Sequence, residues 1–247
     1  MAETAKPLLV LRGPAGIPVH VTLGSVLFYL ACGLFGAVVM GTWLSIIGIP
    51  LLFLIAVAAH EAGHAWVAHQ QGATVNHVSL NFGGGRCDYA DGTVSGGLWV
   101  ALGGPLANVA LAVLVCVVMV ASMTVAMLFG VNPGLGLAWD VVVWLTVFMV
   151  INLGLAALNM FPFLPLDGGL ALQFLLMRWW PPLRVQRIVG WIGLIGGVIW
   201  IAAMVVVFWR WAIPVPVWPS PLLHWRMARA DEYDHGVIRL DGDELPA

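Results

Sequence analysis

The chain carries two histidines and a glutamate close together, in the pentapeptide His60-Glu-Ala-Gly-His64. On an α-helix His60 and His64 are four residues apart, so their imidazoles project from one face. Two imidazoles one turn apart can bind the same zinc ion, at about 2.0–2.1 Å each. Glu61 lies beside them and could act as general base for an attacking water. The segment therefore indicates a metal-dependent hydrolytic site.

A third ligand must come from elsewhere in the chain, because a catalytic zinc usually has three protein ligands and one open position. The strongest candidate is Asp167, in Leu166-Asp-Gly-Gly169. The two glycines after it allow the backbone to approach closely. Alone, an Asp-Gly pair is most often a turn. Next to a histidine pair that is embedded in lipid, ligation becomes the better interpretation.

The composition places these residues in a membrane. The chain has 247 residues, of which 61% are hydrophobic and 9% charged, whereas soluble domains have about 25% charged residues. A water-soluble enzyme and a disordered chain are both excluded. With a net charge of −2 the chain has no excess of positive charge that would bind a polyanion, so we expect no nucleic-acid partner. We therefore expect the protein to be surrounded by membrane lipid.

The spacing of charges predicts the membrane spans. Between Arg12 and Arg86 the only charged residue is Glu61, and an ionisable residue inside a span is by default a functional hypothesis. We predict an all-α polytopic membrane protein with about five to six transmembrane helices. The predicted spans cover about residues 21–40, 51–69, 98–129, 141–158 and 191–208, with a short link at 45–50 and a short helix at 170–180 that either crosses or does not.

A small β-hairpin is predicted in the polar loop at about residues 70–97, between the second and third spans. Val78, Leu80 and Phe82 alternate with polar residues, as in a strand with two unlike faces. A Gly-rich break follows at 83–85, and Cys87 to Val94 is the predicted return strand. An irregular loop is the alternative.

The predicted organisation is an N-terminal segment (1–20), a transmembrane domain that carries the metal-dependent hydrolytic site (21–211) and an interfacial, flexible C-terminal tail (212–247). Lys6 and Arg12 favour a cytoplasmic N-terminus. The loop with Arg86 is then cytoplasmic, and the site lies toward the cytoplasmic side. The side of the C-terminus depends on whether 170–180 crosses.

Two motifs together give the chain a family resemblance. His60-Glu-x-x-His64, followed about a hundred residues later by Asn159-x-x-Pro-x-x-Pro-x-Asp167-Gly, resembles the site-2 protease family of intramembrane zinc metalloproteases. The run Leu102–Asn108 resembles that family's Gly-x-x-x-Asn pattern, and the Gly-rich stretch 81–85 resembles its membrane-associated hairpin. The resemblance covers about residues 51–173, without a PDZ or CBS domain.

The resemblance implies roles for individual residues. His60, His64 and Asp167 would ligate one zinc ion, and Glu61 would be the catalytic base. Asn159 would hold the substrate or the oxyanion, although an Asn before a proline turn is more often a helix terminator. The implied location is a bacterial-type inner membrane, and the implied partner is a transmembrane protein substrate. A regulatory membrane partner is left open.

Other interpretations remain open at this stage. Gly104 and Asn108 are interpreted as helix-packing residues, since small residues and buried amides join helices in membranes. His224 lies outside the apolar spans and has no ligand spacing to a partner. The alternative functions are a non-proteolytic membrane zinc carrier or sensor, and a pseudo-protease scaffold. A hydrogen-bonded cluster that only joins helices is the structural alternative.

Overall fold

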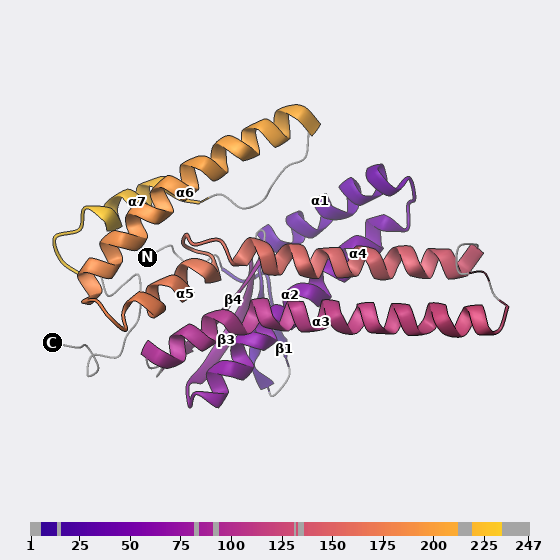
Figure 1. The fold of residues 1–247 in the computed structure, drawn as a ribbon, viewed down its shortest axis with the longest axis horizontal. Coiled ribbons are helices and arrows are strands. Elements are labelled where there is room, and N and C mark those ends of the chain that lie inside the picture. Colours follow the sequence, from indigo (N-terminus) through magenta and orange to yellow (C-terminus); the bar gives the residue numbers. More distant parts are fainter. Residues whose placement is uncertain are drawn as a thin grey trace.

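The computed structural model describes residues 6–13, 16–81, 84–90, 94–130, 132, 136–211 and 219–233. These residues form seven helices and one small sheet (Figure 1). The five long helices are α1 (Leu23–Met40), α2 (Ser45–Gln70), α3 (Val94–Leu128), α4 (Gly136–Asn159) and α6 (Pro182–Trp211). The two short helices are α5 (Asp167–Leu176) and α7 (Pro221–Ala228). The strands are β1 (Leu9–Arg12), β2 (Pro18–Val21), β3 (Thr74–Asn81) and β4 (Gly84–Ala90).

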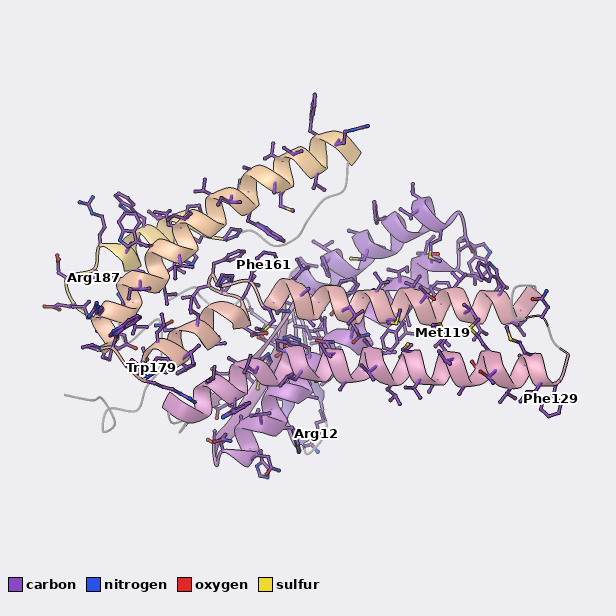
Figure 2. The ribbon with its side chains drawn as sticks, in the orientation of Figure 1. Arg12, Met119, Phe129, Phe161, Trp179 and Arg187 are labelled. Atoms are coloured by element: carbon purple, nitrogen blue, oxygen red, sulfur yellow. The ribbon has the colours of Figure 1, made fainter. Side chains whose placement is uncertain are left out.

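The five long helices are each long and apolar enough to cross a membrane, with mean hydropathy from 1.9 to 2.7. Apolar side chains cover their outer surfaces; Phe129, at the far tip of α3, is 82% exposed (Figure 2). The ten residues of α5 reach only about 15 Å, half the thickness of the hydrocarbon core. The prediction of a helical, multi-pass membrane protein is confirmed, and five of its described helices have the length to span.

The predicted link at 45–50 is wrong, because α2 begins at Ser45 and contains Pro50. Proline has no N–H to donate, so the Ile46 carbonyl one turn earlier loses its helical partner. Gly33 of α1 lies against that carbonyl and the Pro50 ring. The close approach of α1 therefore covers the place where the helix lacks a hydrogen bond. Helices α3 and α6 also begin before the predicted starts at 98 and 191.

The predicted hairpin is confirmed as β3 and β4, which pair antiparallel with Leu80 opposite Gly85. The return strand begins at Gly84, earlier than the predicted Cys87, because a Gly-rich segment can still pair through its backbone. The intervening Phe82 and Gly83 lie outside the described residues, as do residues 91–93.

The sheet also contains two strands that the sequence analysis does not predict. The order is β1-β2-β3-β4, and β2 runs parallel to β3, with Val19 opposite Val78 and Val21 opposite Leu80. Each of the new strands has four residues, too few for alternation to be recognised. The segment before α1 and the loop after α2 thus form one sheet, at one end of the first two spans.

Helix α2 lies at the centre of the fold, packed against α1, α3, α4 and the sheet. Its residues Ala56 and Val57 form a buried cluster with Leu80 and Leu155. At the crossing with α3, a Cβ on Gly63 would meet the Gly103 carbonyl oxygen and lie 2.7 Å from the Ala107 Cβ. The backbones of α2 and α3 approach this closely because glycine stands at the crossing.

The Gly63→Ala substitution should weaken this crossing. Its methyl group meets backbone atoms of α3, which cannot rotate away, so we expect a loss of about 1–3 kcal/mol. Thermal unfolding in detergent measures it. The matched control is Gly154→Ala in α4, where no atom beyond the adjoining backbone of its own helix lies within 4 Å of the added Cβ. Equal melting temperatures for the two variants would contradict the tight crossing.

Candidate metal centre

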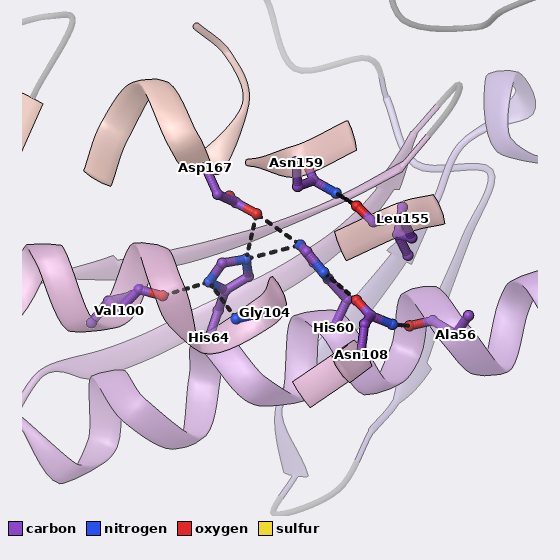
Figure 3. Close-up of polar contacts among 9 residues, drawn as sticks. All are labelled: Ala56, His60, His64, Val100, Gly104, Asn108, Leu155, Asn159 and Asp167. Atoms are coloured by element: carbon purple, nitrogen blue, oxygen red, sulfur yellow. Dashed lines mark hydrogen bonds and ion pairs between the residues drawn. The ribbon is translucent and has the colours of Figure 1, made fainter. Parts of the chain in front are cut away.

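Three side chains from two elements converge next to α2. His60 and His64 project from one face of this helix, and their Nε2 atoms lie 3.1 Å apart (Figure 3). Asp167, the first residue of α5, places its Oδ2 atom 2.9 Å from Nε2 of His60 and 3.4 Å from Nε2 of His64. The two histidines are buried, and the Asp167 side chain is 14% exposed. The two Nε2 atoms and Asp167 Oδ2 therefore form one cluster of three possible ligand atoms.

The three ligand atoms form a triangle whose size suits a zinc ion. Two ligands at tetrahedral positions, each about 2.0–2.1 Å from zinc, lie about 3.3 Å from each other. The three edges here are 2.9, 3.1 and 3.4 Å. Two imidazoles and a carboxylate are also a donor set that zinc takes in catalytic sites, where a fourth position stays open. The residues present therefore fit one zinc ion.

The other ring nitrogens have their own acceptors. His60 Nδ1 donates to the side-chain oxygen of Asn108, and His64 Nδ1 donates to the Val100 carbonyl, both at 2.6 Å. The Gly104 N–H also faces His64 Nδ1, at 3.3 Å, but the shorter contact assigns the proton to Nδ1. With protons on both Nδ1 atoms, both Nε2 lone pairs are directed at the Asp167 carboxylate and the shared position.

Asn108 belongs to a chain of amides that crosses three helices. Its side-chain nitrogen donates to the Ala56 carbonyl at 2.9 Å and to the Asn152 side-chain oxygen at 2.8 Å. The Asn152 amide donates in turn to the Phe148 carbonyl of α4 at 2.8 Å. Both asparagines are fully buried. Each amide is satisfied, so the network fixes the oxygen that receives the His60 proton.

Glycines leave room around the two imidazoles and Glu61. A Cβ on Gly104 of α3 would lie 2.6 Å from His60 Nε2 and against His64 Nε2. On the other side, a Cβ on Gly85 of β4 would collide with the Glu61 carboxylate. Glu61 is 3% exposed, and its Oε2 has no hydrogen-bond partner among the described residues. A buried carboxylate oxygen without a partner is suited to bind a water at the centre.

The segment before Asp167 fits tightly onto the start of α5. A Cβ on Gly169 would lie 2.6 Å from the Phe163 carbonyl carbon and 2.8 Å from the Leu164 nitrogen, and one on Gly168 would meet the Met160 carbonyl. These contacts fix the start of α5 and, with it, the position of the Asp167 carboxylate.

Comparison with known proteins identifies this architecture. No family model matches the chain. Over 179 residues it is 25% identical to a zinc metalloprotease of Methanocaldococcus jannaschii, a match covering 72% of this chain and 48% of that protein. The chain spans about half the length of this curated relative. The solved structure of the site-2 protease from Methanocaldococcus jannaschii superposes with a TM-score of 0.56 and 20% identity, covering 92% of this chain and 97% of that chain.

The chain has the site-2 protease fold. The resemblance that the motifs predict is thereby confirmed in sequence similarity and in architecture. Within this fold the predicted ligands His60, His64 and Asp167 come together, with Glu61 next to them on α2.

Asn159 is a predicted site residue whose side-chain hydrogen bond stays within its own helix. It is the last residue of α4, and its amide donates to the Leu155 carbonyl of its own helix at 3.0 Å (Figure 3). No described hydrogen bond joins it to the three ligands. Its role in holding the substrate or oxyanion stays a prediction.

Sequence reasoning missed part of the polar network around the candidate metal centre. Asn108 does join helices, as predicted, but it also orients His60. Asn152 is absent from the motifs, although a lone Asn in the apolar run of α4 was a usable signal, since polar residues within spans are costly. Gly104 packs against the ligands as well as between helices.

The Asn108→Ala substitution should weaken zinc binding. It removes the acceptor that fixes His60 Nδ1, and loss of such a partner typically costs roughly 10–100-fold in metal affinity. Competition with a zinc chelator measures the affinity of the purified protein. Thr146→Val is the control, because that hydroxyl bonds only within α4 and to Met119. A wild-type affinity in the Asn108 variant would refute the assignment.

Proposed function

We propose that the protein is an intramembrane zinc metalloprotease that hydrolyses peptide bonds of transmembrane substrates. The observation that carries this proposal is the convergence of His60, His64 and Asp167 beside the buried Glu61. Its support comes from the site-2 protease fold and from the relative described as a zinc metalloprotease. Nothing in the described residues favours the alternatives, a zinc carrier or sensor and an inactive scaffold.

The metal ligands define what the bound ion would contribute. His60 and His64 would bind through Nε2, and Asp167 through Oδ2. Zinc held there supplies Lewis acidity, which polarises a scissile carbonyl and makes water more acidic. The remaining steps belong to side chains of this protein.

Glu61 moves the proton in this mechanism. Its unpartnered Oε2 accepts a proton from the attacking water and later delivers it to the leaving amine. Gly85 leaves no space between this carboxylate and β4, so the carboxylate is held in one place. Asn159, at the end of α4, would donate its amide to the substrate or the developing oxyanion after releasing Leu155.

The substrate must unwind before it can react. A transmembrane helix hides its peptide groups in its own hydrogen bonds, and a freed segment needs new partners inside the membrane. The sheet order makes β4 an edge strand among the described strands, and its Gly85 touches Glu61. Pairing with β4 would satisfy the substrate backbone beside the general base.

The expected cellular setting is a bacterial-type inner membrane, with the site toward the cytoplasmic side. This orientation rests on Lys6 and Arg12 ahead of α1 and on the three arginines between α5 and the first turns of α6. A regulatory membrane partner is compatible with the proposal but has no assigned surface.

The Glu61→Gln variant tests the proposal directly. It should keep zinc, because Glu61 is not one of the three ligands, and it should lose cleavage by at least about a hundredfold, since general-base catalysis contributes that much. Zinc content is measured by mass spectrometry of the purified protein. Cleavage is measured by comparing membrane-protein fragments in cells that express the wild-type or the variant chain.

Glu232→Gln is the matched control, because it makes the same change at an exposed position. It should preserve both zinc and cleavage. Identical fragments from wild type and Glu61→Gln would overturn the proposal. Zinc flux into liposomes with the wild-type protein, unaccompanied by any fragment, would favour the carrier instead.

Cleavage should also depend on how easily the substrate helix opens. In a model transmembrane substrate, an Asn-Pro pair next to the scissile bond should raise the cleavage rate at least about tenfold over an all-Leu segment, because proline costs a helix about 3 kcal/mol. Reconstituted protein and gel analysis measure the rates. Equal rates would contradict unwinding as a required step.

A further inference from the structure

A histidine near the C-terminus contacts the segment that carries Asp167. His224 of α7 is fully buried. The Leu164 N–H donates to its Nε2 at 3.1 Å, across 60 residues of sequence. Its Nδ1 lies 2.8 Å from the Ser220 carbonyl, to which it donates. The ring is thus a neutral imidazole with both nitrogens in use, and burial lowers the pKa of His224, which favours this form.

Helix α6 holds this ring in place. At Gly193, an added Cβ would collide with the His224 ring, and at Gly190 it would lie 2.8 Å from the Ala228 Cα. The two glycines let α7 lie directly on α6. The ring is therefore enclosed between Gly193 on one side and Leu164 on the other, with no space to rotate away.

Leu164 connects this contact to the metal centre. Leu164 and Phe163 are almost completely buried, at 4% and 1% exposure. Gly169 packs directly against both of their backbones, and the Leu166 N–H donates to the Phe163 carbonyl at 3.1 Å. The position of Leu164 therefore determines where α5 begins. Asp167 is the first residue of α5.

We propose that His224 is a positioning residue of the metal centre, and that α7 helps to hold the Asp167 carboxylate at the two imidazoles. The inference rests on the proposed metal site but not on hydrolysis. His224 would act through position alone: its imidazole accepts a hydrogen bond from the Leu164 N–H and so fixes the segment from 163 to 167. Without this acceptor the buried N–H lacks a partner, and the segment shifts to find one.

Substitutions at His224 test this role through zinc affinity, measured by competition with a chelator on the full-length protein in detergent. His224→Leu removes the acceptor, and we expect zinc binding about tenfold weaker, at the low end for outer partners of metal ligands. His224→Gln can place its side-chain oxygen near the Nε2 position, and it should bind zinc within about threefold of wild type.

Two further variants separate positioning from general stability. Val115→Ala removes two methyl groups from a buried position of α3, which has 7% exposure and lies outside the buried cluster that contains Leu164; it should lower the melting temperature but keep zinc affinity. Gly193→Ala displaces the ring from the α6 side and should weaken zinc binding as His224→Leu does. This variant decides the question if His224→Leu does not fold.

Two results would overturn the proposal. One is wild-type zinc affinity in both His224→Leu and Gly193→Ala. The other is an equal loss of affinity in Val115→Ala at a matched melting temperature. The wild-type protein distinguishes these failures from failure of the proposed function: if it binds no zinc, the metal site itself is wrong, whereas tight wild-type binding with unaffected variants rejects only the role of His224.

Discussion

Polar groups buried in an apolar bundle need partners, and this requirement shapes the centre of the protein. His60 and His64 on α2 each donate from Nδ1 to a fixed oxygen, the Asn108 side-chain oxygen and the Val100 carbonyl respectively. Both Nε2 atoms then have only Asp167 and the shared position to face. The hydrogen bonds around the centre and the three candidate ligand atoms therefore belong to one arrangement.

Close backbone contacts make that arrangement possible. Gly104 lies against the imidazoles, Gly85 against the Glu61 carboxylate, and Gly63 against α3. A side chain at any of these positions would occupy the space of an imidazole, of the Glu61 carboxylate or of the neighbouring helix. Because these positions are glycine, α3 and the edge strand β4 approach closely enough to line the site. This explains how a site with few charges can still hold its ionisable groups in fixed positions.

The sequence predicted the site better than the elements around it. Two histidines at helical spacing in an apolar context were enough to predict a pair of imidazoles on one face of α2, because helix periodicity is local. Asp167 followed from zinc's need for a third ligand. Strands β1 and β2 could not be predicted, because four residues carry no recognisable period and β2 pairs with β3 across about 60 residues. The start of α2 was misplaced because Pro50 reads as a break, whereas Gly33 on another helix accommodates it.

The three predicted ligands differ in which contacts fix their positions. His60 and His64 are fixed by their own helix, so their separation follows from one turn of α2. Asp167 begins a ten-residue helix behind a non-helical segment, and local geometry alone does not determine its position. Contacts from distant parts of the chain must supply that constraint: Gly168 and Gly169 against 160–164, and His224 against Leu164. The third ligand is therefore where the centre is most sensitive to the rest of the molecule, and α7, which sequence composition assigns to a tail, belongs structurally to its support.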